Sequence, residues 1–350
     1  MSKGSDSVET GKAAVLSAEG YDRGRSLMIV ALSVLIPVVI SLILRYVFQG
    51  ESYGTEAETV NQWFLNNIIG VCNSTTKLVI PAALGYILTK SRHGAIVLIA
   101  VAALGCSVGD LLADFFDVAV RVVFQLPEGG FLSSVSVITT VISTVVSLIV
   151  SCLIYRALVA ESRIASVTEE FYRSARKRLV VSYIIAFIMQ SVFSSGILIV
   201  GAFVLQEAEM SWFNAAINVI IAVPFYLVIY FSGYDLKKDT SDGLKMLSCY
   251  FLSVRFANFV LVVLILLSGT FANFTGMASY MADMSGTDSL SMLTVISSGS
   301  ASFVSIVFEI IVMLWSVKYL FPPESVSEAP FEPREVRLTG KYSDIEDEQN

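Results

Sequence analysis

The sequence has little charge and almost no histidine. Only 15% of its 350 residues are charged, and His93 is its single histidine, whereas soluble domains carry about 25% charged residues. So little charge excludes an ordinary water-soluble fold, which could not hide this much apolar side chain from water. The lone histidine argues against a histidine-based metal site, and the lack of a basic stripe argues against nucleic-acid binding.

Cysteines and catalytic motifs are also scarce. The four cysteines, Cys72, Cys106, Cys152 and Cys249, are scattered through apolar segments, and no two are spaced as a C-x-x-C pair. This pattern favours small buried hydrophobic residues over a zinc or disulfide framework. Nucleotide-binding loops, HExxH and GxSxG are missing as well. The sequence therefore supports neither an enzyme, nor a cofactor, nor a metal site.

Long apolar segments are what the chain does contain. It is 55% hydrophobic, with a mean hydropathy of +0.72, and a membrane-spanning helix needs about 20 mostly apolar residues. Eight segments qualify: 26–48, 63–89, 94–114 (or on to 124), 131–155, 179–205, 212–231, 246–269 and 293–317. The polar run 73–77 interrupts the second. The sequence predicts an all-α integral membrane protein with about eight transmembrane helices.

The distribution of Lys and Arg predicts the topology. If the N-terminus is cytoplasmic, the outside loops 49–62, 125–130, 206–211 and 270–292 contain no Lys or Arg, while the inside segments are basic. Cytoplasmic loops of membrane proteins carry this excess, so we expect both termini to be cytoplasmic. By default, we expect the plasma (cytoplasmic) membrane.

Three polar segments flank or divide the membrane domain, which covers 26–320. Residues 1–25 form a polar cytoplasmic segment without the order of a signal peptide. Residues 321–350 form an acidic tail with few apolar residues, which predicts disorder. The connector 156–178 is either an amphipathic helix on the anionic inner leaflet or a plain solvated linker.

Two halves of the chain resemble each other. Stretches that begin at Leu132 and Leu290 share Leu-Ser, Val-Ile and Val-Ser pairs at matching positions, and Trp63-Phe64 corresponds to Trp212-Phe213. The halves 26–158 and 179–320 are then parallel four-helix repeats related by an axis along the membrane normal, with a polar site expected between them. Chance resemblance between Ser/Val/Ile-rich helices is the alternative.

Small residues line one face of the fourth and eighth segments. Ser143, Ser147 and Ser151 are spaced by four residues, as are Ser297, Ala301 and Ser305. Small residues at this spacing let helix backbones approach closely. We expect these two helices to be central and to pack against other helices, while a hydroxyl-lined pathway is the alternative.

Three charged residues are expected near mid-membrane, where charge is costly and marks a functional hypothesis. From the helical rise, Arg255 and Glu309 lie about 15 Å, and Lys77 about 20 Å, from the nearest predicted boundary. We predict an Arg255–Glu309 ion pair, which Asn258 could extend one turn away. The pair either fixes helix register or takes part in binding or gating. Lys77 follows the polar run, which suits an ion site if it breaks the helix.

An acidic cluster ends the third segment. Asp110, Asp114 and Asp117 share one helical face, and Asp110 lies about 26 Å from His93 at helical rise. These residues form either a solvated helix end or a cation-attracting outer vestibule.

Two classes of function remain. The leading hypothesis is a transporter or channel for an ion or small solute, with a polar site at mid-membrane. The other is a non-transporting membrane subunit or scaffold that assembles with membrane protein partners, or with copies of itself, through its small-residue faces. In either case the lipid bilayer is a partner.

Overall fold

The chain is helical throughout the described residues. The computed structural model describes residues 6–48, 56–124, 134–160, 169–204, 207–237, 240–286 and 289–321, and among these there is no strand. The prediction of an all-α protein is therefore confirmed for this part of the chain. The described helices are α1 (Asp6–Phe48), α2 (Glu56–Thr89), α3 (Arg92–Phe124), α4 (Ser134–Ala160), α5 (Glu169–Val204), α6 (Glu207–Lys237), α7 (Thr240–Phe274), α8 (Met277–Ser285) and α9 (Ser289–Leu320).

Six of the described helices are long and apolar enough to cross a membrane. They are α1, α2, α3, α4, α7 and α9. The described apolar part of α6, Ile220–Leu236, is shorter. Large apolar side chains such as Ile43, Ile149 and Phe303 lie exposed on the outside of the bundle, which suits contact with lipid chains rather than water. The chain is thus a membrane-embedded helical protein.

Several helices extend beyond the predicted spans. Helix α1 begins at Asp6, so it includes most of the segment 1–25, and α3 continues to Phe124, the longer of the two predicted ends. The predicted loop 270–292 contains the additional helix α8. Gly276 and Gly286 flank α8 with positive φ angles of 69° and 70°, a conformation that glycine adopts without steric cost.

The polar run 73–77 does not interrupt α2, so the predicted break is wrong. The Thr75 hydroxyl donates to the Val71 carbonyl at 2.7 Å and the Thr76 hydroxyl to the Asn73 carbonyl at 2.9 Å. Because these hydroxyls bond to carbonyls of their own helix, they need no partner elsewhere. The backbone therefore continues as a helix through the polar residues.

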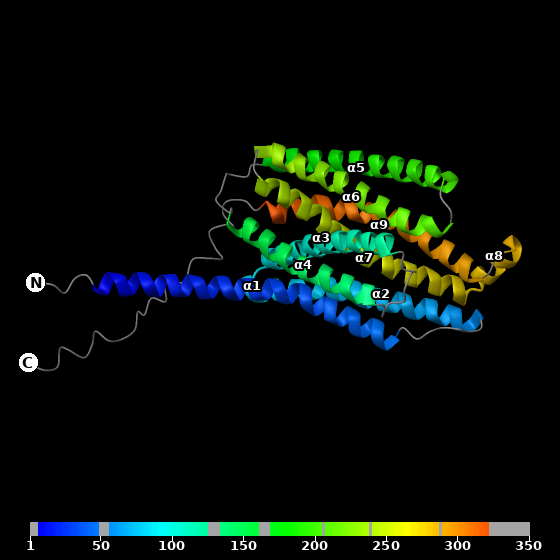
Figure 1. Ribbon diagram of the computed structural model, residues 1–350, viewed down its shortest axis with the longest axis horizontal. Coiled ribbons are helices and arrows are strands. Elements are labelled where there is room, and N and C mark those ends of the chain that lie inside the picture. Colours follow the sequence, from blue (N-terminus) through cyan, green and yellow to red (C-terminus); the bar gives the residue numbers. More distant parts are fainter. Residues whose placement is uncertain are drawn as a thin grey trace, which may run out of the picture.

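The helices pack mainly against their neighbours in the chain. The most extensive contacts join α7 to α9 and α3 to α4, and further contacts join α1 to α2, α2 to α3, α5 to α6 and α6 to α7. Across the middle of the bundle, α3 contacts α7, α2 contacts α7, and α3 contacts α6. Figure 1 shows the long helices running roughly parallel to one another, with α8 at the end opposite the start of α1.

Basic residues gather at one end of this bundle. The α2–α3 connection, the end of α4, the start of α5, the α6–α7 connection and the end of α9 all lie at the end where α1 enters the bundle (Figure 1). Described basic residues at these positions are Lys90, Arg92, Arg156, Arg173, Arg176, Lys177, Arg178, Lys245 and Lys318, and Arg25 lies on α1 where that helix enters the bundle. We call this the basic end.

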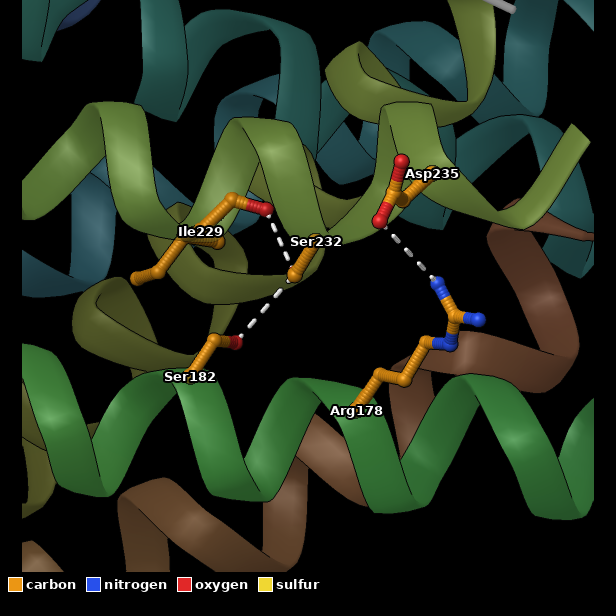
Figure 2. A network of polar contacts seen from close by, with 5 residues as sticks. All are labelled: Arg178, Ser182, Ile229, Ser232 and Asp235. Carbon is orange, nitrogen blue, oxygen red and sulfur yellow. Dashed lines mark hydrogen bonds and ion pairs between the residues drawn. The ribbon is translucent and has the colours of Figure 1, made fainter. Parts of the chain in front are cut away.

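Polar contacts join α5 to α6 near the basic end (Figure 2). The Ser182 hydroxyl donates to the Ser232 hydroxyl at 3.2 Å, which itself donates to the Ile229 carbonyl at 2.7 Å. About one turn beyond Ser232 on α6, Asp235 pairs with Arg178 at 3.9 Å. Both members of that ion pair are partly exposed, so it contributes little to stability.

Two predictions about the polar segments change. The connector 156–178 is divided between the end of α4 and the start of α5, where Tyr172, Ala175 and Leu179 form a buried stripe. Phe321, the first residue of the predicted tail, is buried, and its carbonyl accepts a hydrogen bond from the Tyr172 hydroxyl at 2.5 Å. Residues 322–350 and 161–168 lie outside the described residues.

Candidate functional site

Helices α3 and α4 cross at a pair of glycines. A Cβ added at Gly105 would lie 1.9 Å from the Ser151 Oγ, and one at Gly109 would lie 2.0 Å from the Ser147 Oγ and 2.6 Å from the Ser143 carbonyl oxygen. Such contacts leave no room for a side chain, so the glycines allow the backbones to approach. The predicted packing of the serine face of α4 is confirmed.

The corresponding face of α9 packs against α7. Ser297, Ala301 and Ser305 are buried, and the Ser305 hydroxyl donates to the Ala257 carbonyl of α7 at 3.1 Å. Both small-residue faces therefore make contacts within this chain. This removes the feature that suggested assembly with other proteins through these faces.

A polar cluster surrounds Cys106 in the middle of α3. The charges of Arg255 on α7, Asp110 on α3 and Lys77 on α2 act on the Cys106 thiol, which also has a hydrogen bond with the Ser147 side chain of α4. Three helices thus bring a charged side chain each to this position, and α4 adds a hydroxyl group. The structure joins Lys77 and Arg255, which we predicted at mid-membrane, with Asp110, for which we predicted either a solvated helix end or an outer vestibule.

The position of this cluster follows from helical geometry. Cys106 is twelve residues beyond Gly94 at the start of α3, which corresponds to about 18 Å of helix. This is near the middle of a hydrocarbon layer about 30 Å thick. Asp110, one turn further, accepts a 2.7 Å hydrogen bond from the Ser143 hydroxyl of α4. The cluster can therefore present two cationic groups and a hydrogen-bonded carboxylate within the bilayer.

Glu309 on α9 belongs to a different group of residues. Its carboxylate accepts a hydrogen bond from the Tyr183 hydroxyl of α5 and acts electrostatically on Tyr250 of α7. The Tyr183 and Tyr250 ring centroids are 6.2 Å apart, and Phe225 lies 5.1 Å from Tyr250. With Tyr226 and Phe251, these rings form what we call the aromatic cluster.

The predicted Arg255–Glu309 ion pair does not form within the described part of the chain. The Ser305–Ala257 bond sets the two residues within about one turn of each other in height, as their predicted depths required. They differ in direction, however. Tyr250 and Arg255 are five residues apart on α7, so their side chains point in directions about 140° apart around the helix axis. Arg255 therefore faces away from Tyr250 and acts on Cys106 of α3 instead.

Three further predicted site residues are Asn258, Asp114 and Asp117. Asn258 is exposed on α7, whereas Arg255 is partly buried, so the proposed extension of the network by Asn258 has no structural support. Asp114 is exposed on α3. The backbone of Asp117 lies in α3, but its side chain lies outside the described residues.

Sequence reasoning missed three features of these sites. Gly105 and Gly109 form a G-x-x-x-G pattern, the known small-residue partner for a close helix crossing. The tyrosines of the aromatic cluster give no spacing signal in the sequence, because they come from three different helices. The sequence G-Y-x-L-x-K, which begins at Gly85 and recurs at Gly233, was also overlooked.

Comparisons with known proteins do not assign these groups a role. No family model, curated protein or solved structure matches the chain. Among the described residues, no group of three or more His, Cys, Asp or Glu side chains could hold a metal ion. The interpretation of the site therefore depends on its own geometry.

Proposed function

We propose that this protein moves an ion or small solute across the plasma membrane, as a transporter or channel. In this proposal α5 and α6 also cross the membrane, so eight spans form two parallel four-helix repeats with both termini cytoplasmic. The single observation that carries the proposal is the polar cluster, in which Lys77, Asp110 and Arg255 act on one position from three helices. Charge at mid-membrane depth is costly and commonly marks a pathway.

The pattern of helix packing supports the two repeats. If α1–α4 correspond to α5, α6, α7 and α9, the main contacts in the first half have counterparts in the second: α3–α4 matches α7–α9, α1–α2 matches α5–α6, α2–α3 matches α6–α7 and α1–α4 matches α5–α9. Between the halves, α2–α7 corresponds to α6–α3, and α3 meets its own counterpart α7. This is the pattern expected for two units related by an axis along the membrane normal.

A repeated hairpin geometry supports the same duplication. A Cβ at Gly85 would lie 2.5 Å from the Gly94 carbonyl oxygen, and one at Gly233 would lie 2.5 Å from the Asp242 carbonyl oxygen, next to Gly243. Both glycine contacts bring together the two helices of a hairpin at the basic end, α2 with α3 and α6 with α7. Under this correspondence Cys106 and Arg255 occupy equivalent places on α3 and α7.

The proposed pathway therefore follows the contact between the two halves. Lys77 and Asp110 come from the first half and Arg255 from the second, so any relative movement of the halves would change their separation. The gathering of Lys and Arg at the basic end supports a cytoplasmic assignment of that end.

The test is solute flux through the purified protein in liposomes. We expect Arg255→Gln to reduce flux at least tenfold because it removes one of the two cations, whereas Arg255→Lys should retain part of it. Lys318→Gln, at an exposed helix end, is the control and should transport normally. If folded wild-type protein moves no cation, anion or small metabolite, the proposal is wrong and the scaffold hypothesis takes its place.

A further inference from the structure

We propose that Glu309 and Tyr183 form a proton-binding site in the second half of the protein, separate from the polar cluster. This inference deepens the proposed function, on which it rests for the coupling of the bound proton to solute movement. The ligand is a proton, and the site consists of the Glu309 carboxylate on α9 with the Tyr183 hydroxyl of α5 as its hydrogen-bond donor.

An ionised Glu309 is electrostatically costly at its position on α9. A carboxylate at this depth needs compensation by an opposite charge or by a proton. In the described part of the chain, no ion pair gives Glu309 a cationic partner. A single hydrogen bond from Tyr183 compensates only part of a full negative charge. A bound proton removes that charge altogether.

The surroundings of Glu309 contain no described basic group directed at it. Helix α9 packs against α3, α5, α7 and α8. From α5 the facing titratable group is Tyr183, and from α7 it is Tyr250. Arg255, at a similar height on α7, acts on Cys106 of α3. Helix α8 lies at the far end of the bundle (Figure 1).

The same surroundings favour a proton over a metal cation. Hard metal cations take six or more oxygen ligands, whereas this position offers one carboxylate and tyrosine hydroxyls. The nearby rings of the aromatic cluster are closely packed, with the Tyr226 and Phe251 centroids 4.9 Å apart and the Phe225 and Tyr250 centroids 5.1 Å apart. A proton needs only one acceptor atom and no such space.

The binding step involves no oxidation or reduction. A proton adds to a lone pair of one Glu309 carboxylate oxygen and forms a neutral carboxylic acid, and release leaves the pair on the oxygen. Tyr183 can donate to the other oxygen in both states. Because Tyr183 lies on α5 and Glu309 on α9, a change in this contact links the protonation of Glu309 to the packing of two helices.

The first test is infrared spectroscopy of the full-length protein in liposomes during a pH titration. We expect a band from a protonated carboxylic acid that disappears in Glu309→Gln and shifts in frequency in Tyr183→Phe. Glu169→Gln, an exposed residue at the start of α5, is the control and should leave the band unchanged. Absence of the band at every pH, or its persistence in Glu309→Gln, would overturn the proposal. If Glu309→Gln does not fold, the shift in Tyr183→Phe decides, and an unchanged band there overturns the assignment.

The second test separates this inference from the proposed function. With a solute that the wild type transports, an imposed pH gradient should change the rate severalfold, and Glu309→Gln should abolish that dependence. Transport that is indifferent to both the gradient and the substitution would overturn the coupling and leave the transport function standing. A Glu309-dependent band in a folded protein that moves no solute would support the proton site and overturn the proposed function.

Discussion

Single hydrogen bonds at the basic end hold segments that are far apart in the sequence. The clearest is the 2.5 Å bond from the Tyr172 hydroxyl to the Phe321 carbonyl, which joins the start of α5 to the end of α9. Phe321 also packs against the Phe171 ring at 5.6 Å, and the Lys245 ammonium lies 5.4 Å from its centroid. The residue that follows α9 is therefore fixed by contacts from both α5 and α7.

The phenol group of Tyr172 should make the stability of the folded protein depend on pH in the alkaline range. Burial, and secondarily the charge of Glu169, raises the pKa of Tyr172 above its ordinary value. The folded state then holds the phenol proton more tightly than the unfolded state. Its contribution to stability is full below the unfolded pKa, near 10, and is lost as the pH rises through the higher folded pKa.

We predict that Tyr172→Phe lowers the free energy of unfolding by about 1 kcal/mol at neutral pH, because the Phe321 carbonyl loses its donor. Above about pH 10, the wild type should lose stability more steeply than the variant. Denaturant unfolding in detergent at a series of pH values measures both effects. Tyr280→Phe, exposed on α8, is the control, and equal alkaline slopes for wild type and Tyr172→Phe would contradict the prediction.

At the scale of elements, close helix crossings organise the bundle. The α3–α4 crossing depends on Gly105 and Gly109, and the α2–α3 and α6–α7 hairpins depend on glycines at the basic end. Lipid provides little hydrophobic driving force for helices to associate, so such crossings depend on close packing and on hydrogen bonds. A side chain inserted at a crossing should therefore separate the two helices.

We predict that Gly109→Ala destabilises the protein by about 1–3 kcal/mol, because the new methyl group collides with Ser147 and with the Ser143 backbone. The midpoint of thermal unfolding in detergent measures this effect. Gly299→Ala in α9 is the matched control, since no neighbouring atom lies within 4 Å of its added Cβ. It should be neutral or slightly stabilising, and equal losses for both variants would argue against a steric role for Gly109.

At the scale of the whole molecule, the long helices alternate in direction, so each connection between them lies at one of the two ends of the bundle. The basic end contains Arg173 and Lys318, while Asn273 and Asp283 lie at the opposite end, around α8. An eight-span protein with cytoplasmic termini requires these two pairs to face opposite sides of the membrane.

We predict that single cysteines at Asn273 and Asp283 react with a membrane-impermeant maleimide in intact cells. Cysteines at Arg173 and Lys318 should react only after the membrane is permeabilised. The variants need a background that lacks the four native cysteines, of which Cys72 is exposed, and that background without an added cysteine is the control. Labelling of both pairs from the same side would exclude the eight-span topology.

The sequence by itself indicated a membrane environment and the helical class of this protein. Low charge and long apolar runs are local properties, so they indicate membrane helices without knowledge of packing. The serine faces of α4 and α9 were also predictable, because a spacing of four residues defines one face of a helix. The predicted break at 73–77 was wrong because threonine hydroxyls can bond to carbonyls of their own helix.

Only the tertiary structure decided which polar groups meet. Arg255 and Glu309 have opposite charge and similar depth, and from these properties a pair was expected. The rotation of each helix about its axis, which comes from packing against several neighbours at once, directs Arg255 toward Cys106 and Glu309 toward Tyr183. Depth follows from counting residues along one helix, whereas direction depends on contacts between residues distant in the chain.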